Sequence, residues 1–426
     1  MQPFALVFFD TKLNKYSFNS LSGVLDSEEH LKSIPVFFFK EEQELLSGLI
    51  ELLENFKKVI LGFSFFTTQV WNFVSLIKRI RRDFKSYRDR IYLIAGGPHP
   101  TGDVKRTLRA GVDFVFVGEA ERSFKEFLEA LLSKRDPFKV KGIAYLSSDE
   151  PVFTGKPSQV DLNEFAPFSL RLNRIGPIEI TRGCPYGCFY CQTPRIFGGR
   201  VRHRNIENIL YWVDKLLKRG IRDFRFITPN AFSYGSQDGR VVNFDALEEL
   251  LKSLYKKIKT KNGRIFFGSF PSEVRPEHVS EKTLELISRY ADNKNLVIGA
   301  QSGSDRVLRL CNRKHTVEDV LRAVKLCKRF GLIPKVDFIF GLPGEEKEDV
   351  EQTIEVMQRL SELGAIIHAH TFMPIPQTPF SKEKPGELSP QLLKTINKLL
   401  GRGKLFGDWQ SQKALSQKIY EYLNTI

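Results

Sequence analysis

The first third of the chain alternates short apolar runs with amphipathic stretches. The runs that have the length of a buried strand lie at 5–9, 36–39, 59–66, 91–95 and 114–117. Apolar residues recur at helical spacing between these runs, at 41–56, 70–84, 103–110 and 123–132. Strands that alternate with helices predict a parallel, doubly wound sheet, so we expect a Rossmann-like α/β domain in residues 1–136.

A second alternating region follows a break. Residues 137–167 hold several prolines and no strong helical period, which predicts a linker with small strands. From 168 to 386 the alternation resumes, with strands expected at 177–181, 224–227, 265–268, 296–300, 336–340 and 365–372. Helices are expected at 205–218, 244–258, 276–290, 316–330 and 346–363. This region predicts a partial (β/α)6 TIM-type barrel, because the eight-fold barrel takes about 250 residues. Residues 387–426 are predicted to form a helical C-terminal tail.

Composition narrows the class of protein. Hydrophobic residues make up 42% of the 426 residues and charged residues 27%, which is typical of a globular protein. No apolar run approaches the roughly 20 residues that span a bilayer, so we expect no transmembrane segment. The segment Met1–Asp10 lacks the basic and long apolar parts of a secretory signal, which predicts a cytoplasmic protein.

The chain is basic, with a formal net charge of +15. Such a charge suits a nucleic acid, an anionic lipid or an anionic substrate, and it equally describes a solvated surface rich in lysine and arginine. No nucleic-acid-binding module is recognisable, so an anionic substrate is the partner that the charge suggests.

Three cysteines carry the strongest chemical signal. Cys184, Cys188 and Cys191 stand at Cys-x3-Cys-x2-Cys spacing, directly after the expected strand 177–181. Soft thiolates this close together suit an iron–sulfur cluster, and three ligands leave one iron of a 4Fe–4S cluster without a protein thiolate. A structural zinc site would need a fourth ligand, which is not evident nearby. The loop would lie at the C-terminal end of a barrel strand, where barrel enzymes hold their active sites.

This motif, with the aromatic Tyr190 before the last cysteine, resembles that of the radical S-adenosylmethionine (SAM) superfamily. The resemblance implies a 4Fe–4S cluster whose open iron binds SAM, and reductive cleavage of SAM by one electron. It also implies an electron donor such as ferredoxin or flavodoxin. A cluster-bearing binding or electron-transfer protein without turnover is the alternative from another class.

Segments after two later strands resemble those of methylthiotransferases and cobalamin-dependent radical enzymes. These segments are 301–304 and 341–345, and the resemblance implies that polar groups after the third and fourth strands contact SAM. The residues expected to bind SAM are Tyr190, Ser269, Glu273, Gln301 and Ser302. Gln301 and Ser302 could hydrogen-bond ribose hydroxyls. Glu273, together with Arg275, could meet the amino and carboxylate groups. The alternative for each residue is an ordinary turn or helix cap.

The loops 96–100 and 118–121 resemble those of the cobalamin-binding domain that precedes the radical domain in one large subgroup. The contacts that this implies are Ser64, Thr67, Gly97 and Glu119. The Asp-x-His-x-x-Gly motif of many such domains is absent after the first strand. The domain therefore either binds cobalamin without a histidine below the cobalt, or no longer binds it.

Two outcomes follow from these readings. With cobalamin, the resemblance implies methylation of an unactivated carbon. Without cobalamin, it implies rearrangement, carbon–carbon bond formation or a methylthiotransferase-like reaction. Methylthiotransferases, however, carry three more cysteines upstream, and no cysteine precedes Cys184 in this sequence.

Overall fold

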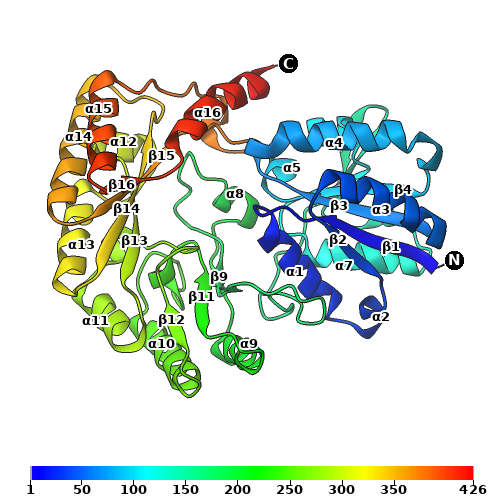
Figure 1. The fold of residues 1–426 in the computed structure, drawn as a ribbon, viewed down its shortest axis with the longest axis horizontal. Helices are drawn as coiled ribbons and strands as arrows, with labels where there is room; N and C mark the ends of the chain where they lie inside the picture. The colour runs from blue at the N-terminus through cyan, green and yellow to red at the C-terminus, as the bar shows by residue number, and fades with distance from the viewer. Residues whose placement is uncertain (1, 426) are drawn as a thin grey trace. The chain divides into compact units, whose positions relative to one another are not determined.

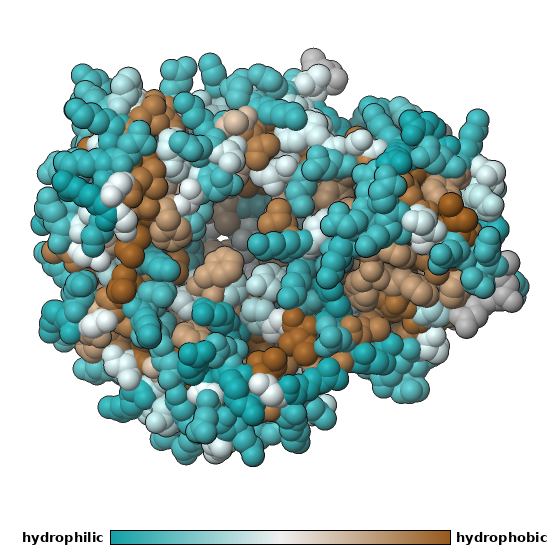
Figure 2. Space-filling view, in the orientation of Figure 1, coloured by the Kyte–Doolittle hydropathy of each residue, from teal (hydrophilic) through white to brown (hydrophobic). Residues whose placement is uncertain are grey.

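The computed structural model describes residues 2–425 and divides the chain into two compact units, Met1–Gly176 and Pro177–Ile426. Figure 1 labels the helices and strands of both units. None of the helices within residues 2–425 is long and apolar enough to cross a membrane. On the face drawn in Figure 2, hydrophilic side chains predominate, as the charged fraction of 27% leads one to expect.

The first unit is built on a seven-stranded sheet with the order β2-β1-β3-β4-β5-β6-β7. Its strands are β1 (Gln2–Phe9), β2 (Val36–Phe39), β3 (Phe56–Ser64), β4 (Ile91–Gly96), β5 (Phe114–Phe116), β6 (Ile143–Ser147) and β7 (Glu150–Phe153). The first five run parallel, and β6 and β7 run antiparallel to their neighbours. The order of the parallel strands is that of flavodoxin-like sheets, which confirms the predicted Rossmann-like fold.

Helices cover both faces of this sheet (Figure 1). They are α1 (Lys15–Leu25), α2 (Glu29–Lys32), α3 (Glu42–Asn55), α4 (Val70–Asp83), α5 (Pro98–Gly102), α6 (Val104–Arg109) and α7 (Glu121–Leu132). The apolar periodicity did not reveal α1, because its buried residues include the small or polar Asn19, Ser22 and Gly23. A Cβ on Gly23 would stand 2.1 Å from the carbonyl oxygen of Ala166, so the helix packs directly against another backbone segment.

The expected linker, residues 137–167, lies within the first unit. Its strands β6 and β7 extend the sheet beyond β5, and its later part buries Val160, Leu162 and Phe165. The prolines of this segment therefore break helical periodicity without separating the segment from the core.

The second unit contains the parallel strands of a partial barrel, in two groups with the orders β12-β11-β8 and β13-β14-β15-β16. The strands of these groups are β8 (Ile178–Glu179), β11 (Asp223–Ile227), β12 (Arg264–Phe266), β13 (Asn295–Gln301), β14 (Ile333–Phe340), β15 (Ile366–Thr371) and β16 (Leu405–Phe406). The short strands β9 (Thr181–Arg182) and β10 (Arg202–His203) form a separate antiparallel pair. An isolated parallel bridge joins Val274, in the segment after β12, to Ile298 of β13. The predicted partial barrel is confirmed.

The helices of the second unit connect or flank these strands, and most of them lie on the outer side (Figure 1). They are α8 (Thr193–Phe197), α9 (Ile206–Lys218), α10 (Phe244–Lys259), α11 (Glu281–Tyr290), α12 (Asp305–Leu310), α13 (Val317–Arg329), α14 (Lys347–Glu362), α15 (Pro390–Gly401) and α16 (Trp409–Asn424). Their buried stripes explain why periodicity located most of them: α10 buries Leu247, Leu250, Leu251, Leu254 and Ile258.

The C-terminal tail is helical, as predicted, and also adds a strand. Between α15 and α16 the short β16 pairs in parallel with β15. A Cβ on Gly407 would lie 2.2 Å from the carbonyl oxygen of Ala369, so glycine is needed where the tail turns along β15. The tail thereby brings Phe406 and Gln412 to the wall of the cavity described next.

Candidate active site

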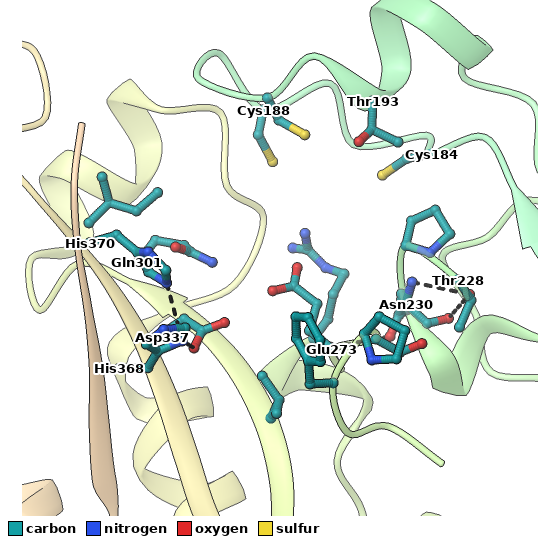
Figure 3. Close-up of a pocket in the computed structure, with 18 of the residues that line it drawn as sticks. Cys184, Cys188, Thr193, Thr228, Asn230, Glu273, Gln301, Asp337, His368 and His370 are labelled. Carbon is teal, nitrogen blue, oxygen red and sulfur yellow. Dashed lines mark hydrogen bonds and ion pairs between the residues drawn. The ribbon is translucent and has the colours of Figure 1, made fainter. Parts of the chain in front are cut away.

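A cavity of about 1230 Å³ lies inside the second unit. Residues from β8, β9, β11, β13, β14, β15 and β16 line it, together with the loops that follow β9, β11, β12 and β15. Ligand pockets commonly measure about 300–1,000 Å³, so this cavity has room for more than one small molecule. Figure 3 shows two sides of it, with the cysteine loop facing Glu273 and Asp337 across open space.

The cysteine loop is held by backbone contacts on both sides. The Cys184 N–H donates to the Gly198 carbonyl at 3.1 Å, and the Phe189 N–H donates to the Cys311 carbonyl at 3.0 Å. The Asn312 side-chain amide donates to the Tyr186 carbonyl at 2.9 Å. Gly183 has φ +91°, and a Cβ there would stand 2.1 Å from the Arg200 carbonyl oxygen. Hydrogen bonds and close packing within the chain therefore help to shape this loop.

The three sulfur atoms suit a cluster better than a single ion. The Cys184 and Cys188 sulfur atoms point into the cavity (Figure 3), and Cys191 lines it as well. Among residues 2–425, only Asp337, His368 and His370 form a set of three ligand atoms that all lie within 4.8 Å of one another, so the cysteine sulfurs are spread more widely. A multi-iron cluster holds its thiolates apart because each ligates a different iron.

Burial and charge act on these thiols in opposite directions. Burial raises the pKa of Cys191 to about 11 and raises that of Cys184 as well. The thiols of Cys184 and Cys191 are thus protonated at neutral pH without iron, and cluster binding has to displace these two protons. Arg313 supplies the compensating charge, since its Nη1 lies 3.8 Å from the Cys188 sulfur and its side chain is buried.

Four of the five residues expected to contact SAM line the cavity: Tyr190, Ser269, Glu273 and Gln301. The fifth, Ser302, is buried outside the lining, and its hydroxyl accepts the backbone N–H of Ser304 at 3.2 Å. Ser302 thus forms a local turn, which was the alternative reading of that residue.

Buried polar atoms at this cavity fit SAM. Within the described part of the chain, Tyr190 Oη, Arg275 Nη2 and Arg313 Nε are buried without a hydrogen-bond partner. Two guanidinium donors and a phenol suit a carboxylate and neighbouring polar groups. Burial raises the pKa of Glu273 to about 7, although Arg313 opposes this rise.

The backbone of β13 aims Gln301 into the cavity. The register of β13 against β14 shifts between Gly299 and Gln301, and Gln301 has φ +74°. A bulge of this kind turns a side chain away from the regular alternation of a strand. A Cβ on Gly299 would lie 2.8 Å from Gln301 Nε2 and 2.9 Å from Arg313 Nη2, so polar side chains converge on that glycine.

The four residues expected to contact cobalamin lie after parallel strands of the first unit. Ser64 ends β3, and its buried hydroxyl has no hydrogen-bond partner among residues 2–425. Gly97 follows β4 with φ +86°, and a Cβ there would stand 2.5 Å from the Ser64 hydroxyl. Thr67 and Glu119 face inward, because Thr67 lies 3.1 Å from His99 Nδ1 and Glu119 accepts the Val160 N–H.

This edge of the sheet fits a corrinoid without a histidine ligand. Leu13 and Phe66, in the loops after β1 and β3, are 58% and 43% exposed. His99 is fully buried, and burial lowers its pKa to about 4. The other histidine of this unit, His30, lies on α2 beside Glu129. The Ser64 hydroxyl has no hydrogen-bond partner within the described residues and lies close to Gly97. Together with the exposed apolar side chains of Leu13 and Phe66, it suits a large, mostly apolar ring.

Sequence reasoning missed several polar residues that line the cavity, and four of them matter most here: Arg313, Asp337, His368 and His370. The last three occupy strand positions that alternate with buried apolar residues, as Asp337 does between Val336 and Phe338. Strand alternation could have revealed them. Arg313 lies in a loop and carries no comparable signal.

Comparisons with known proteins agree with this description. Residues 178–357 match the Radical SAM superfamily, and residues 22–128 match the B12 binding domain. An uncharacterized protein of Methanopyrus kandleri is 27% identical over 365 residues, which span 72% of this chain and 65% of that protein. An uncharacterized methyltransferase of Pyrococcus horikoshii is 25% identical over 350 residues, 78% of this chain and 71% of that protein.

Solved structures show the same fold. The radical SAM methyltransferase TsrM from Kitasatospora setae, with cobalamin and a 4Fe–4S cluster bound, gives a TM-score of 0.68 at 15% identity, covering 90% of this chain and 74% of that one. The cobalamin-dependent SAM radical enzyme OxsB gives 0.66 at 15% identity, covering 84% and 52%. The predicted recognition is confirmed at the level of domains: in this chain a B12 binding domain precedes a radical SAM domain.

Proposed function

We propose that this enzyme is a cobalamin-dependent methyltransferase that acts on an unactivated carbon. The observation that carries the proposal is the cavity in which Cys184, Cys188 and Cys191 face Glu273 and Gln301 across a space larger than one small ligand requires. The B12 binding match in the first unit adds the second cofactor. A relative that is 25% identical carries the name methyltransferase, which supports the reaction type.

When bound, the cluster supplies the electron that cleaves SAM, and cobalamin supplies the methyl group. The chain's own residues bind and orient. Arg275 and Arg313 hold the SAM carboxylate, Glu273 accepts its ammonium group, and Gln301 hydrogen-bonds a ribose hydroxyl. Tyr190 and the buried walls exclude water from the reacting groups.

A low-potential electron donor and a reducing compartment belong to the same proposal. Ferredoxin and flavodoxin are acidic donors of suitable type, and a net charge of +15 favours their encounter with this chain. All five cysteines are free of disulfides, which agrees with a cytoplasmic location.

The test begins with the anaerobically reconstituted full chain. We expect about four irons per chain, dithionite-dependent formation of 5′-deoxyadenosine or S-adenosylhomocysteine from SAM, and co-elution of hydroxocobalamin on gel filtration. Replacing Cys184, Cys188 and Cys191 by alanine should abolish iron binding and SAM turnover.

Two results would separate the alternatives. Turnover of SAM without corrinoid binding would leave a cobalamin-independent radical enzyme and overturn the methyltransferase assignment. A cluster that never cleaves SAM would leave an iron–sulfur binding or electron-transfer protein.

A further inference from the structure

Three metal-ligating side chains meet on the cavity wall, away from the cysteine loop. Asp337 of β14 pairs directly with His368 of β15, and His370 follows two residues later on the same face of the strand. His368 Nδ1 lies 2.9 Å from Asp337 Oδ1 and 3.2 Å from His370 Nε2. In Figure 3 these side chains lie on the side of the cavity opposite Cys184 and Cys188.

Hydrogen bonds alone do not satisfy this arrangement. His368 Nδ1 carries either one hydrogen or one lone pair. A hydrogen that points at Asp337 does not point at His370. If Nδ1 instead accepts a hydrogen from His370, its lone pair faces the Asp337 oxygen at 2.9 Å. With Asp337 ionised, one of the two short contacts therefore lacks a hydrogen bond of its own in either tautomer.

A neighbouring amide adds a further constraint. Gln412 Oε1 accepts the Thr371 N–H at 2.8 Å, which places the Gln412 amide nitrogen 3.4 Å from His370 Nδ1. A cation bound by all three lone pairs would resolve both short contacts. One unfavourable contact would remain. If His370 binds the metal through Nε2, its hydrogen is on Nδ1, and this hydrogen faces the amide nitrogen of Gln412. At 3.4 Å, this contact between Gln412 and His370 is the longest of the three.

Two of the three distances between ligand atoms match those around one ion, and all three atoms lie within 4.8 Å of one another. With metal–ligand distances of about 2.1 Å, octahedral to tetrahedral angles place neighbouring ligand atoms about 3.0–3.4 Å apart. The observed 2.9 and 3.2 Å agree with this spacing. The Phe406 ring stacks on His368 at 4.4 Å with an interplanar angle of 8°, which fixes the imidazole in place.

We propose that Asp337, His368 and His370 bind one divalent transition-metal ion, separate from the iron–sulfur cluster. Two imidazoles and one carboxylate suit Zn²⁺, Fe²⁺, Co²⁺ or Mn²⁺. Three protein ligands leave coordination positions open toward the cavity, as in catalytic metal sites. The ion holds an anionic oxygen of the substrate there, with Lys335 beside it on the cavity wall.

The test uses the anaerobic full-length protein with its cluster oxidised, and hence diamagnetic, and with no corrinoid added. Mn²⁺ is the probe, because the electron paramagnetic resonance signal of free Mn²⁺ counts the unbound ion. We expect one tight site per chain, from which Zn²⁺ displaces Mn²⁺. Asp337→Asn and His370→Gln each remove one of three ligands and should weaken binding by about a hundredfold or more, since even outer-shell changes cost 10–100-fold.

Gln412→Glu distinguishes a metal from a shared proton. Glutamate still accepts the Thr371 N–H and also accepts the hydrogen on His370 Nδ1, so Mn²⁺ binding should become about tenfold tighter. His30→Gln, at an exposed histidine of the first unit, is the matched control and should bind like the wild type.

Three results overturn the proposal: wild-type protein that leaves Mn²⁺ free, Asp337→Asn and His370→Gln variants that bind like wild type, or Gln412→Glu that binds more weakly. Iron content and circular dichroism of the same samples show that each variant is folded. SAM cleavage, measured separately, keeps a failure of this site distinct from a failure of the proposed methyl transfer.

Discussion

Arg313 is the single residue on which the charges of the cavity depend most. Its buried guanidinium lies 3.8 Å from the Cys188 sulfur and donates to the Gly299 carbonyl. A positive charge beside a cluster favours the reduced, more negative state. We expect Arg313→Met to lower the reduction potential of the cluster by about 60 mV, a tenfold change for one electron.

Redox titration followed by electron paramagnetic resonance measures this shift. Arg313→Lys keeps the positive charge and loses the planar guanidinium group. The reduction potential of its cluster should therefore lie between those of Arg313→Met and wild type. An unchanged potential in Arg313→Met would show that the charge is too far away or too well screened to act on the cluster.

Glu273 should make the cluster-free protein sensitive to pH. Burial raises its folded-state pKa to about 7, against an ordinary value of 4.5. Below pH 4.5 both folded and unfolded states hold the proton. As pH rises toward 7 the unfolded state loses its proton first, so the folded state loses stability, by about 3 kcal/mol in total.

Urea unfolding at pH 5 and pH 8 tests this effect. Glu273→Gln should remove that part of the pH dependence and be the more stable protein at pH 8. Glu44→Gln, at an exposed position on α3, is the control and should follow wild type. Equal pH dependence in Glu273→Gln and wild type would mean that Glu273 is ionised when buried.

The backbone conformation that directs the Gln301 side chain into the cavity is strained. A φ of +74° costs a residue with a Cβ about 1 kcal/mol relative to glycine. We therefore expect the free energy of unfolding, measured with urea, to be higher for Gln301→Gly than for Gln301→Ala by about 1 kcal/mol. Both variants should bind SAM more weakly, as isothermal titration would measure. Equal stability of the two would remove the argument from strain.

At the scale of elements, the cysteine loop depends on the turn after α12. Asn312 has φ +56°, and its amide donates to two carbonyls of the loop, at 2.9 and 3.3 Å. Asn312→Gly keeps this backbone conformation and removes both hydrogen bonds, each worth about 1 kcal/mol. We expect a chelator to extract iron roughly tenfold faster from Asn312→Gly, as followed by loss of visible absorbance.

Asn262→Gly is the control for this change. It makes the same substitution at another residue with positive φ, 54°, away from the cavity. Iron loss at the same rate in Asn312→Gly and wild type would show that the other contacts suffice to hold the loop.

Elements with a strong apolar period could be predicted from the sequence, and elements built on close packing could not. The helices α3 and α10 showed clear stripes of leucine. The helix α1 did not, because it packs through Gly23 against backbone. The strand β16 is two residues long and shows no alternation of its own.

For the whole molecule, a local motif was enough to predict the cysteine side of the cavity. The opposite side could be found only from the tertiary structure. Three cysteines within one short loop identify a cluster site from spacing alone. The residues opposite them come from β14 and β15, and only strand pairing shows that Asp337 meets His368. Arg313 escaped notice because its role depends on burial beside Cys188, which no sequence period encodes.

The backbone contacts of the cysteine loop bear on how the protein acquires its iron. Cys184 and Phe189 are tied to Gly198 and Cys311 through main-chain hydrogen bonds that involve no metal. In a zinc finger the metal drives folding, so that apoprotein and unfolded protein are the same thing. Here hydrogen bonds within the chain, in addition to any metal ligation, fix the main chain of the loop. We therefore expect the iron–sulfur cluster to be inserted into a loop that is already folded. After oxygen has destroyed the cluster, we expect it to be rebuilt in the folded protein, without unfolding of the chain.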